Sequence, residues 1–108
     1  MILAIDFDNV IMDTKHPVEG KRMGLPIEGA QESIVKFARW GYTVIIFTLR
    51  GDEKGRGAVA EWMKFYGMPY YKEITNIKPQ CDVYLDDKGL RFEGWNKALK
   101  DIDNLARK

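Results

Sequence analysis

Apolar residues fall in short unbroken runs at several places along this chain. The runs at 2–6 and 42–48 are rich in β-branched and aromatic residues and are too short for helices, so they predict two buried strands. The run at 82–86 predicts a further strand, and the run at 69–75 predicts a weaker one.

Elsewhere the apolar residues repeat at helical spacing, which predicts three helices. The repeats are Ala30, Ile34, Phe37 and Ala38, then Ala58, Val59, Trp62, Met63 and Tyr66, then Trp95, Ala98, Leu99, Ile102 and Leu105. The second helix is expected to cover residues 55–66. Gly41 and Gly67 stand where a left-handed residue would end the first two helices.

The resulting order is strand, helix, strand, helix, strand, strand, helix. This alternation predicts an α/β fold, a single three-layer α/β/α Rossmann-like domain over residues 1–108 with a mostly parallel central sheet. Residues 9–27 leave room only for a tight turn and a short flap. Ligands of such sheets bind at the carboxyl ends of the strands.

Acidic residues stand at those strand ends. The first strand ends in Asp6 and Asp8, the second in Thr48, and the strand at 82–86 in Asp86 and Asp87. Like charges held close together cannot all ionise cheaply, so a cation is expected among them. Oxygen ligands without histidine or cysteine favour Mg²⁺, which also binds substrate phosphate.

Asp6 and Asp8 are expected to project from the same side of an extended segment, with Phe7 pointing into the core. One carboxylate can attack phosphorus and form an aspartyl-phosphate, while the other protonates the leaving oxygen and later activates water. Lys78 and Thr48 could stabilise the charge on the transferring phosphoryl group. The sequence therefore predicts phosphoryl chemistry.

The order DFDNV, Thr48, Lys78 and DVYLDD resembles the four motifs of the haloacid dehalogenase superfamily of phosphohydrolases. The resemblance implies that Asp6 is the nucleophile and that Asp8 is the general acid/base, with its backbone carbonyl on Mg²⁺. It also implies that Thr48 binds phosphate and that Lys78 neutralises charge.

In the same comparison, Asp86 and Asp87 resemble the acidic pair that holds the metal with Asp6 and Asp8, and we favour Asp87 as the direct ligand. Asn9 stands where the family most often has glycine, and Leu49 and Arg50 replace small polar residues. Asn9, Leu49 and Arg50 are nevertheless expected to contact phosphate beside Thr48, in part through backbone amides.

Members of the family commonly carry a cap domain that closes over the site. Residues 9–27 and 49–77 leave no room for one here, so the resemblance is to small capless members. Their open sites admit small phosphomonoesters or phosphorylated macromolecules, and a neighbouring subunit of a homo-oligomer can act as a lid.

Two other functional classes are compatible with acids at strand ends. A response-regulator receiver uses an aspartate phosphoacceptor as a switch, but it carries its acidic pair at the first strand, whereas here the pair comes last. A non-catalytic domain of the same fold would bind Mg²⁺ and phosphate without turnover. Each motif alone also has a structural interpretation, an Asx turn for Asp6 and Asp8 and a solvent-facing lysine for Lys78.

The amino-acid composition limits the classes of molecule that the protein is expected to bind. Seventeen Lys and Arg against sixteen Asp and Glu give a net charge of +1, so no nucleic-acid or membrane surface is indicated, although a nucleic-acid end phosphate stays possible as substrate. The single Cys81 excludes an internal disulfide, and no apolar run approaches the roughly 18 residues of a membrane span. We therefore expect a cytoplasmic location.

Overall fold

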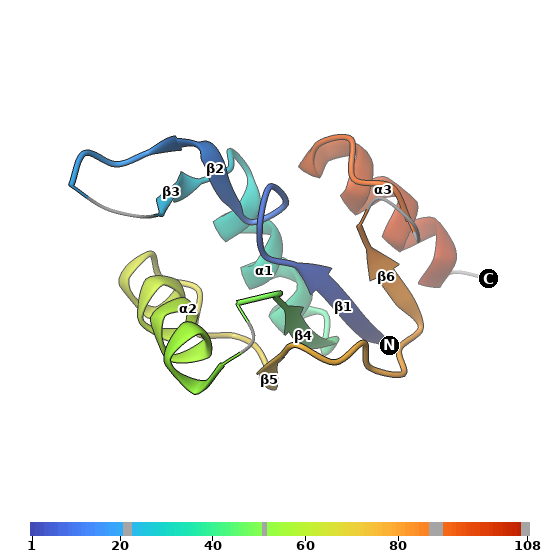
Figure 1. Cartoon of the computed structure of the whole chain (residues 1–108). Helices are drawn as coiled ribbons and strands as arrows, with labels where there is room; N and C mark the ends of the chain where they lie inside the picture. Colours follow the sequence, from blue (N-terminus) through green and yellow to red (C-terminus); the bar gives the residue numbers. More distant parts are fainter. Residues whose placement is uncertain (21–22, 51, 87–89, 107–108) are drawn as a thin grey trace.

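A parallel sheet of four strands forms the centre of the molecule (Figure 1). The computed structural model describes residues 1–20, 23–50, 52–86 and 90–106. The strands are β1 (Ile2–Asp6), β4 (Thr43–Phe47), β5 (Glu73–Thr75) and β6 (Val83–Leu85), in the spatial order β5-β4-β1-β6. All neighbouring pairs run parallel.

Three helices complete the α/β pattern. Helix α1 (Ala30–Arg39) connects β1 to β4, α2 (Glu53–Phe65) connects β4 to β5, and α3 (Trp95–Ala106) follows β6. With the β2–β3 insertion set aside, the order β1-α1-β4-α2-β5 with parallel strands is Rossmann-like, so the predicted α/β class with a mostly parallel sheet is confirmed.

The helix ends follow from local sequence. Gly41 and Gly67 adopt positive φ angles of 78° and 73° just beyond α1 and α2, as predicted. Helix α2 begins two residues earlier than expected, because the Asp52 carboxylate caps it by accepting a hydrogen bond from the Gly55 N–H at 2.6 Å.

A hairpin of β2 (Met12–Pro17) and β3 (Gly24–Pro26) occupies the segment expected to be a turn and flap. It projects away from the sheet above α2 (Figure 1). Two indole N–H groups hold it and the loop that leads into it: that of Trp62 donates to the Gly24 carbonyl of β3 at 2.9 Å, and that of Trp95 donates to the Val10 carbonyl just before β2 at 3.1 Å. Helix α2 therefore fixes the hairpin directly, and α3 fixes the loop before it.

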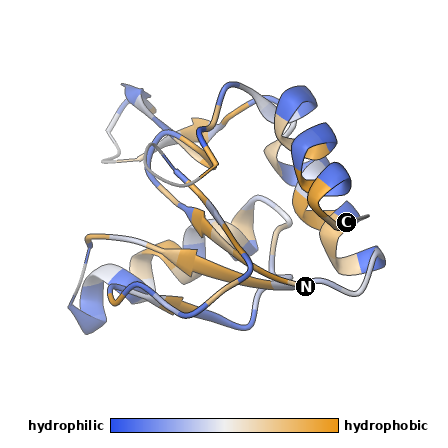
Figure 2. Ribbon diagram, turned by 90° about the vertical axis from the view of Figure 1, so that its right-hand side faces the viewer, coloured by the Kyte–Doolittle hydropathy of each residue, from blue (hydrophilic) through white to orange (hydrophobic). Residues whose placement is uncertain are grey.

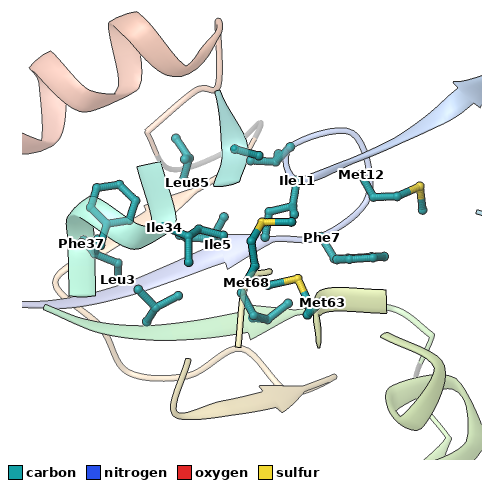
Figure 3. Packing of buried hydrophobic residues seen from close by; sticks show 14 of the residues in the cluster. Leu3, Ile5, Phe7, Ile11, Met12, Ile34, Phe37, Met63, Met68 and Leu85 are labelled. Atoms are coloured by element: carbon teal, nitrogen blue, oxygen red, sulfur yellow. The ribbon is translucent and has the colours of Figure 1, made fainter. Parts of the chain in front are cut away.

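The apolar residues of all three helices join one buried cluster with alternate residues of the strands (Figure 3). The sheet contributes Leu3, Ile5, Val44, Ile46, Val83 and Leu85 to this cluster. Strands β1, β4 and β6 are mostly hydrophobic, whereas the helices carry both hydrophobic and hydrophilic residues (Figure 2).

The intervening strand residues point to the opposite face of the sheet. They are Ala4, Ile45, Phe47 and Tyr84. The segment between β5 and β6 crosses this side, since the Lys78 ammonium lies over the Tyr84 ring.

Some details differ from the sequence prediction. Strand β5 is shorter than the predicted 69–75, and β6 ends at Leu85 because the Asp86 N–H donates to the Leu90 carbonyl at 3.2 Å instead of joining the ladder. In α1 the polar Ser33 is buried and Ala38 is exposed. No helix in the described ranges is long and apolar enough to cross a membrane.

Candidate active site

The strand register places three predicted site residues next to one another at the carboxyl edge of the sheet. Asp6 at the end of β1 pairs with Phe47, which Thr48 follows, and Ile5 pairs with Leu85, which Asp86 follows. Asp6 therefore lies at the end of an inner strand, with Thr48 at the end of one neighbour and Asp86 at the end of the other.

Beyond β1 the chain stays extended for one more residue. The Phe7 N–H donates to the Phe47 carbonyl at 3.0 Å, and the Phe7 ring is fully buried, edge-on against Trp62 at 5.1 Å between centroids. Asp6 and Asp8 on either side of Phe7 are both partly exposed. The alternation expected for the DFD sequence is thus present.

Arg50 joins Asp8 to Thr48. Its Nε atom lies 3.3 Å from the Oδ1 of Asp8, and its backbone N–H donates to the Thr48 Oγ1 at 3.1 Å. The Thr48 N–H in turn donates to the Thr75 carbonyl at 2.9 Å. A hydroxyl oxygen that accepts one hydrogen bond can still donate its own hydrogen, so Thr48 retains a donor for a phosphate oxygen.

The loop after Asp8 explains why asparagine occupies position 9. Asn9 has a φ of 62°, a left-handed conformation that asparagine tolerates better than most residues. Its side-chain oxygen accepts hydrogen bonds from the Thr14 N–H at 3.2 Å and the Thr14 hydroxyl at 2.6 Å. Its own N–H donates to the Met12 carbonyl at 2.7 Å, so this N–H shapes the loop and is not offered to a phosphate.

Leu49 has a side chain that is 82% exposed, so any contribution to phosphate binding must come from its backbone. Lys78 lies in the segment that connects β5 to β6, where its Nζ is 5.3 Å from the centroid of the Tyr84 ring. Asp87, which we favoured as the metal ligand, lies outside the described residues.

Tyr84 was missed by the sequence reasoning. It stands two residues before Asp86 on β6 and pairs with Ala4, which stands two residues before Asp6 on β1. Alternation therefore places the Tyr84 ring on the same face of the sheet as Asp6 and Asp86. The two-residue spacing between Tyr84 and Asp86 in the sequence could have predicted that both side chains lie on the same face of the sheet.

The electrostatics agree with this placement. Burial raises the pKa of Tyr84, and the charges of Asp6 and Asp86 raise it further, because the phenolate would face two carboxylates. The Tyr84 hydroxyl oxygen is buried, and within the described part of the chain it has no hydrogen-bond partner. An uncharged phenol thus lies beside the two acids.

Comparison with known proteins supports the fold alone. No protein-family model matches the chain, and a search of curated proteins found no match. The chain is similar to a solved structure described as a conserved protein from Bacteroides thetaiotaomicron, with a TM-score of 0.77 and 22% sequence identity. The similarity covers 96% of this chain and 90% of that one.

The side chains at this edge offer oxygen donors from Asp6, Asp8 and Asp86. Among the described residues, no group of three acidic, histidine or cysteine side chains stands close enough to form a metal cluster. Asp86 is nevertheless buried, and it shares its surroundings with Asp6 through Tyr84. Two such carboxylates without nitrogen or sulfur partners fit the preference of Mg²⁺, which binds one or two carboxylates and keeps several waters.

Proposed function

We propose that this protein is a Mg²⁺-dependent phosphohydrolase of the haloacid dehalogenase type, without a cap domain, that acts on a phosphomonoester. The observation that carries the proposal is the position of Asp6, at the end of β1 and between the ends of β4 and β6. Thr48, Asp86, the Asp8–Arg50 pair and Lys78 lie around this position, on elements far apart in the sequence.

Each residue has a separate task in the proposed reaction. A carboxylate oxygen of Asp6 attacks phosphorus, the bond from phosphorus to the ester oxygen breaks, and Asp8 donates its proton to that leaving oxygen. Asp8, now ionised, takes a proton from a water molecule that attacks the aspartyl-phosphate. Inorganic phosphate leaves, Asp6 regains its carboxylate, and Asp8 regains its proton.

The phosphoryl group spreads negative charge over three oxygens during transfer, so fixed positive charges and hydrogen-bond donors lower the barrier. Arg50, beside Asp8, and Lys78, over the Tyr84 ring, would supply positive charge, and the Thr48 hydroxyl would supply a hydrogen bond. When bound, Mg²⁺ would offset the negative charge of the carboxylates and of the phosphate. Asp6, Asp86 and Asp87, with the Asp8 carbonyl, would hold it.

Cys81 is a free thiol, which suits the reducing cytoplasm that we expect for this protein. The phosphorylated substrate can be a small molecule or a macromolecule, because the described residues between β1 and β6 form no cap domain over the proposed site.

The test is release of inorganic phosphate from a panel of phosphomonoesters, with Mg²⁺ and after chelation, for the wild-type chain and for Asp6→Asn. We expect release with Mg²⁺, none after chelation, recovery on adding Mg²⁺ back, and none from Asp6→Asn. Full turnover after exhaustive chelation, or turnover by Asp6→Asn, would refute the proposal. Binding of Mg²⁺ and phosphate without any release would instead support the non-catalytic alternative.

A further inference from the structure

A groove of about 740 Å³ runs between the β2–β3 hairpin and α2. Val18 and Met23 line it from the hairpin side, and Trp62, Phe65 and Tyr66 line it from α2. Ligand pockets in proteins typically measure about 300–1,000 Å³. A phosphate group alone would occupy only a small part of this groove, so the groove suits a larger organic group.

The floor of the groove is built rigidly. The Trp62 indole is buried and donates to the Gly24 carbonyl, and the Gly24 N–H lies 3.3 Å from the Met12 sulfur. Trp62 also packs against Phe7 and against Tyr66, at 5.1 Å and 4.7 Å between ring centroids. These contacts join the hairpin, the helix and the strand end in one packed unit, so the groove exists before a ligand arrives.

Phe65 is different, because its ring is 81% exposed at the edge of the groove. It stands edge-on to Tyr66 at 4.9 Å, with an angle of 82° between the rings. A phenylalanine so exposed buries little area in the folded chain, yet it stands against the Tyr66 ring, which in turn packs against Trp62. Aromatic side chains arranged in this way can take up a planar ring by stacking or by edge-to-face contact.

The groove is continuous with the candidate active site through Arg50. This residue lines the groove, and the same side chain lies 3.3 Å from the Asp8 carboxylate. A phosphate near Asp6 and Asp8 would thus stand at one end of the groove, with the rest of its ester directed along the aromatic wall.

We propose that the groove binds the leaving-group half of the substrate and that this half is a planar aromatic ring system. This inference rests on the proposed function and names the class of phosphomonoester that the site would favour. Phe65 and Tyr66 would contact the ring, while Arg50 would hold the phosphate end.

The first test compares two probes, 1-naphthyl phosphate and glycerol 2-phosphate, on the full chain with Mg²⁺. Phe65→Ala should lower kcat/KM for 1-naphthyl phosphate by about five- to tenfold, as expected for the loss of one stacking ring. It should leave kcat/KM for glycerol 2-phosphate nearly unchanged. Leu25→Ala, which removes an exposed apolar side chain from β3 outside the groove, is the matched control and should change neither value.

The second test does not depend on catalysis. The reaction product 1-naphthol is added to the wild-type chain, and the indole N–H signal of Trp62, assigned with Trp62→Phe, is followed by NMR. We expect a saturable shift of this signal in the wild type and a weaker one in Phe65→Ala.

The two tests separate the inference from the function on which it rests. If wild type and Phe65→Ala had the same kcat/KM for each of the two phosphates, and naphthol caused no shift, the groove assignment would be overturned. The phosphatase proposal would still stand. A naphthol shift that depends on Phe65, in a chain that releases phosphate from no member of the phosphomonoester panel, would retain the aromatic site and refute the phosphatase.

Discussion

The ammonium group of Lys78 lies 5.3 Å from the centroid of the Tyr84 ring, within the range of a cation–π interaction. The ring belongs to β6, whereas the lysine belongs to the irregular segment that precedes it. Because Tyr84 shares a face of the sheet with Asp6 and Asp86, the contact holds a positive charge near the two acids. Tyr84 is therefore a positioning residue in the proposed site.

We expect Lys78→Ala to lower kcat/KM for phosphate release by about 10²-fold or more, since it removes a charge that stabilises the transferring phosphoryl group. Tyr84→Leu, which keeps Lys78 but removes the aromatic face, should lower it by only about two- to fivefold. Lys72→Ala removes an exposed lysine just before β5 and serves as the control. Equal losses in the Lys78 and Lys72 variants would contradict the role given to Lys78.

Tyr84→Phe tests the buried hydroxyl. Because that oxygen lacks a hydrogen-bond partner among the described residues, its removal should raise the free energy of unfolding by about 1 kcal/mol at neutral pH. The measurement is urea denaturation followed by circular dichroism.

The advantage of Tyr84→Phe should grow at high pH. Burial and the two carboxylates raise the pKa of Tyr84 above the ordinary 10.0 of an unfolded chain. Above about pH 10 the unfolded state therefore loses a proton that the folded state keeps, so the wild type loses stability as pH rises further and the variant avoids this loss. Burial also raises the pKa of Tyr71, which both chains share, so its contribution cancels in the difference. A constant difference between the two chains from pH 8 to pH 11 would argue against this environment for Tyr84.

Asp6→Asn and Asp8→Asn should fail in different ways. Asp8→Asn keeps the nucleophile, so an activated aryl phosphate whose leaving group needs no proton should still phosphorylate Asp6. The adduct should then persist, because no base activates water, and intact-mass analysis should detect one phosphoryl group. Asp6→Asn should give no adduct, and an adduct on that variant would mean that the nucleophile is misassigned.

Alanine variants at two glycines of α2, Gly55 and Gly57, test whether close packing against the Arg50 backbone holds the Arg50 loop in place. A Cβ atom at Gly55 would lie 2.5 Å from the Arg50 carbonyl oxygen and 2.9 Å from the Asp52 carboxylate, whereas one at Gly57 would meet nothing within 4 Å. Gly57→Ala should stabilise the protein by about 0.5–1 kcal/mol, because alanine favours the helix and restricts the unfolded chain.

Gly55→Ala should instead displace the Arg50 loop and lower both the urea midpoint and phosphate release. Both variants are compared by urea denaturation and activity assay. The gain in helix propensity is common to both, whereas only Gly55→Ala disturbs the close approach to the Arg50 carbonyl. Two alanine variants with the same midpoint and the same activity would show that this close approach does not hold Arg50 in place.

The parallel sheet and its helices could be predicted because their signals are local. A continuous apolar run or a helical repeat is complete within one segment, as in 2–6 and in the repeat from Ala30 to Phe37. The hairpin could not, because most of β2 is polar and exposed, so its strand carries no hydrophobic alternation. Hydrogen bonds from two indoles hold the hairpin and the loop before it, and these bonds join residues that are separated by 38 and by 85 positions in the sequence.

Part of the candidate site could likewise be predicted from local sequence, and part could not. Asp6, Asp8, Thr48 and Asp86 could be placed from strand ends alone, since parallel strands bring their carboxyl ends to one edge. The ion pair between Arg50 and Asp8 joins residues 42 positions apart through a loop, and only the folded chain shows it. Tyr84 was not predicted as a site residue, because a tyrosine in a strand ordinarily indicates a packing role.

Asp6 occupies an inner position at the carboxyl edge of the sheet, with hydrogen-bonded strands on both sides of β1. One of these strands, β6, pairs Val83 with Leu3 and so joins the beginning of the chain to its last third. During synthesis on the ribosome, Asp6 emerges early, but its neighbour Asp86 follows only after the other three strands of the sheet and two helices. If Asp6 is the nucleophile, as we propose, a nascent chain would hold it without its partners until nearly all of the domain had emerged.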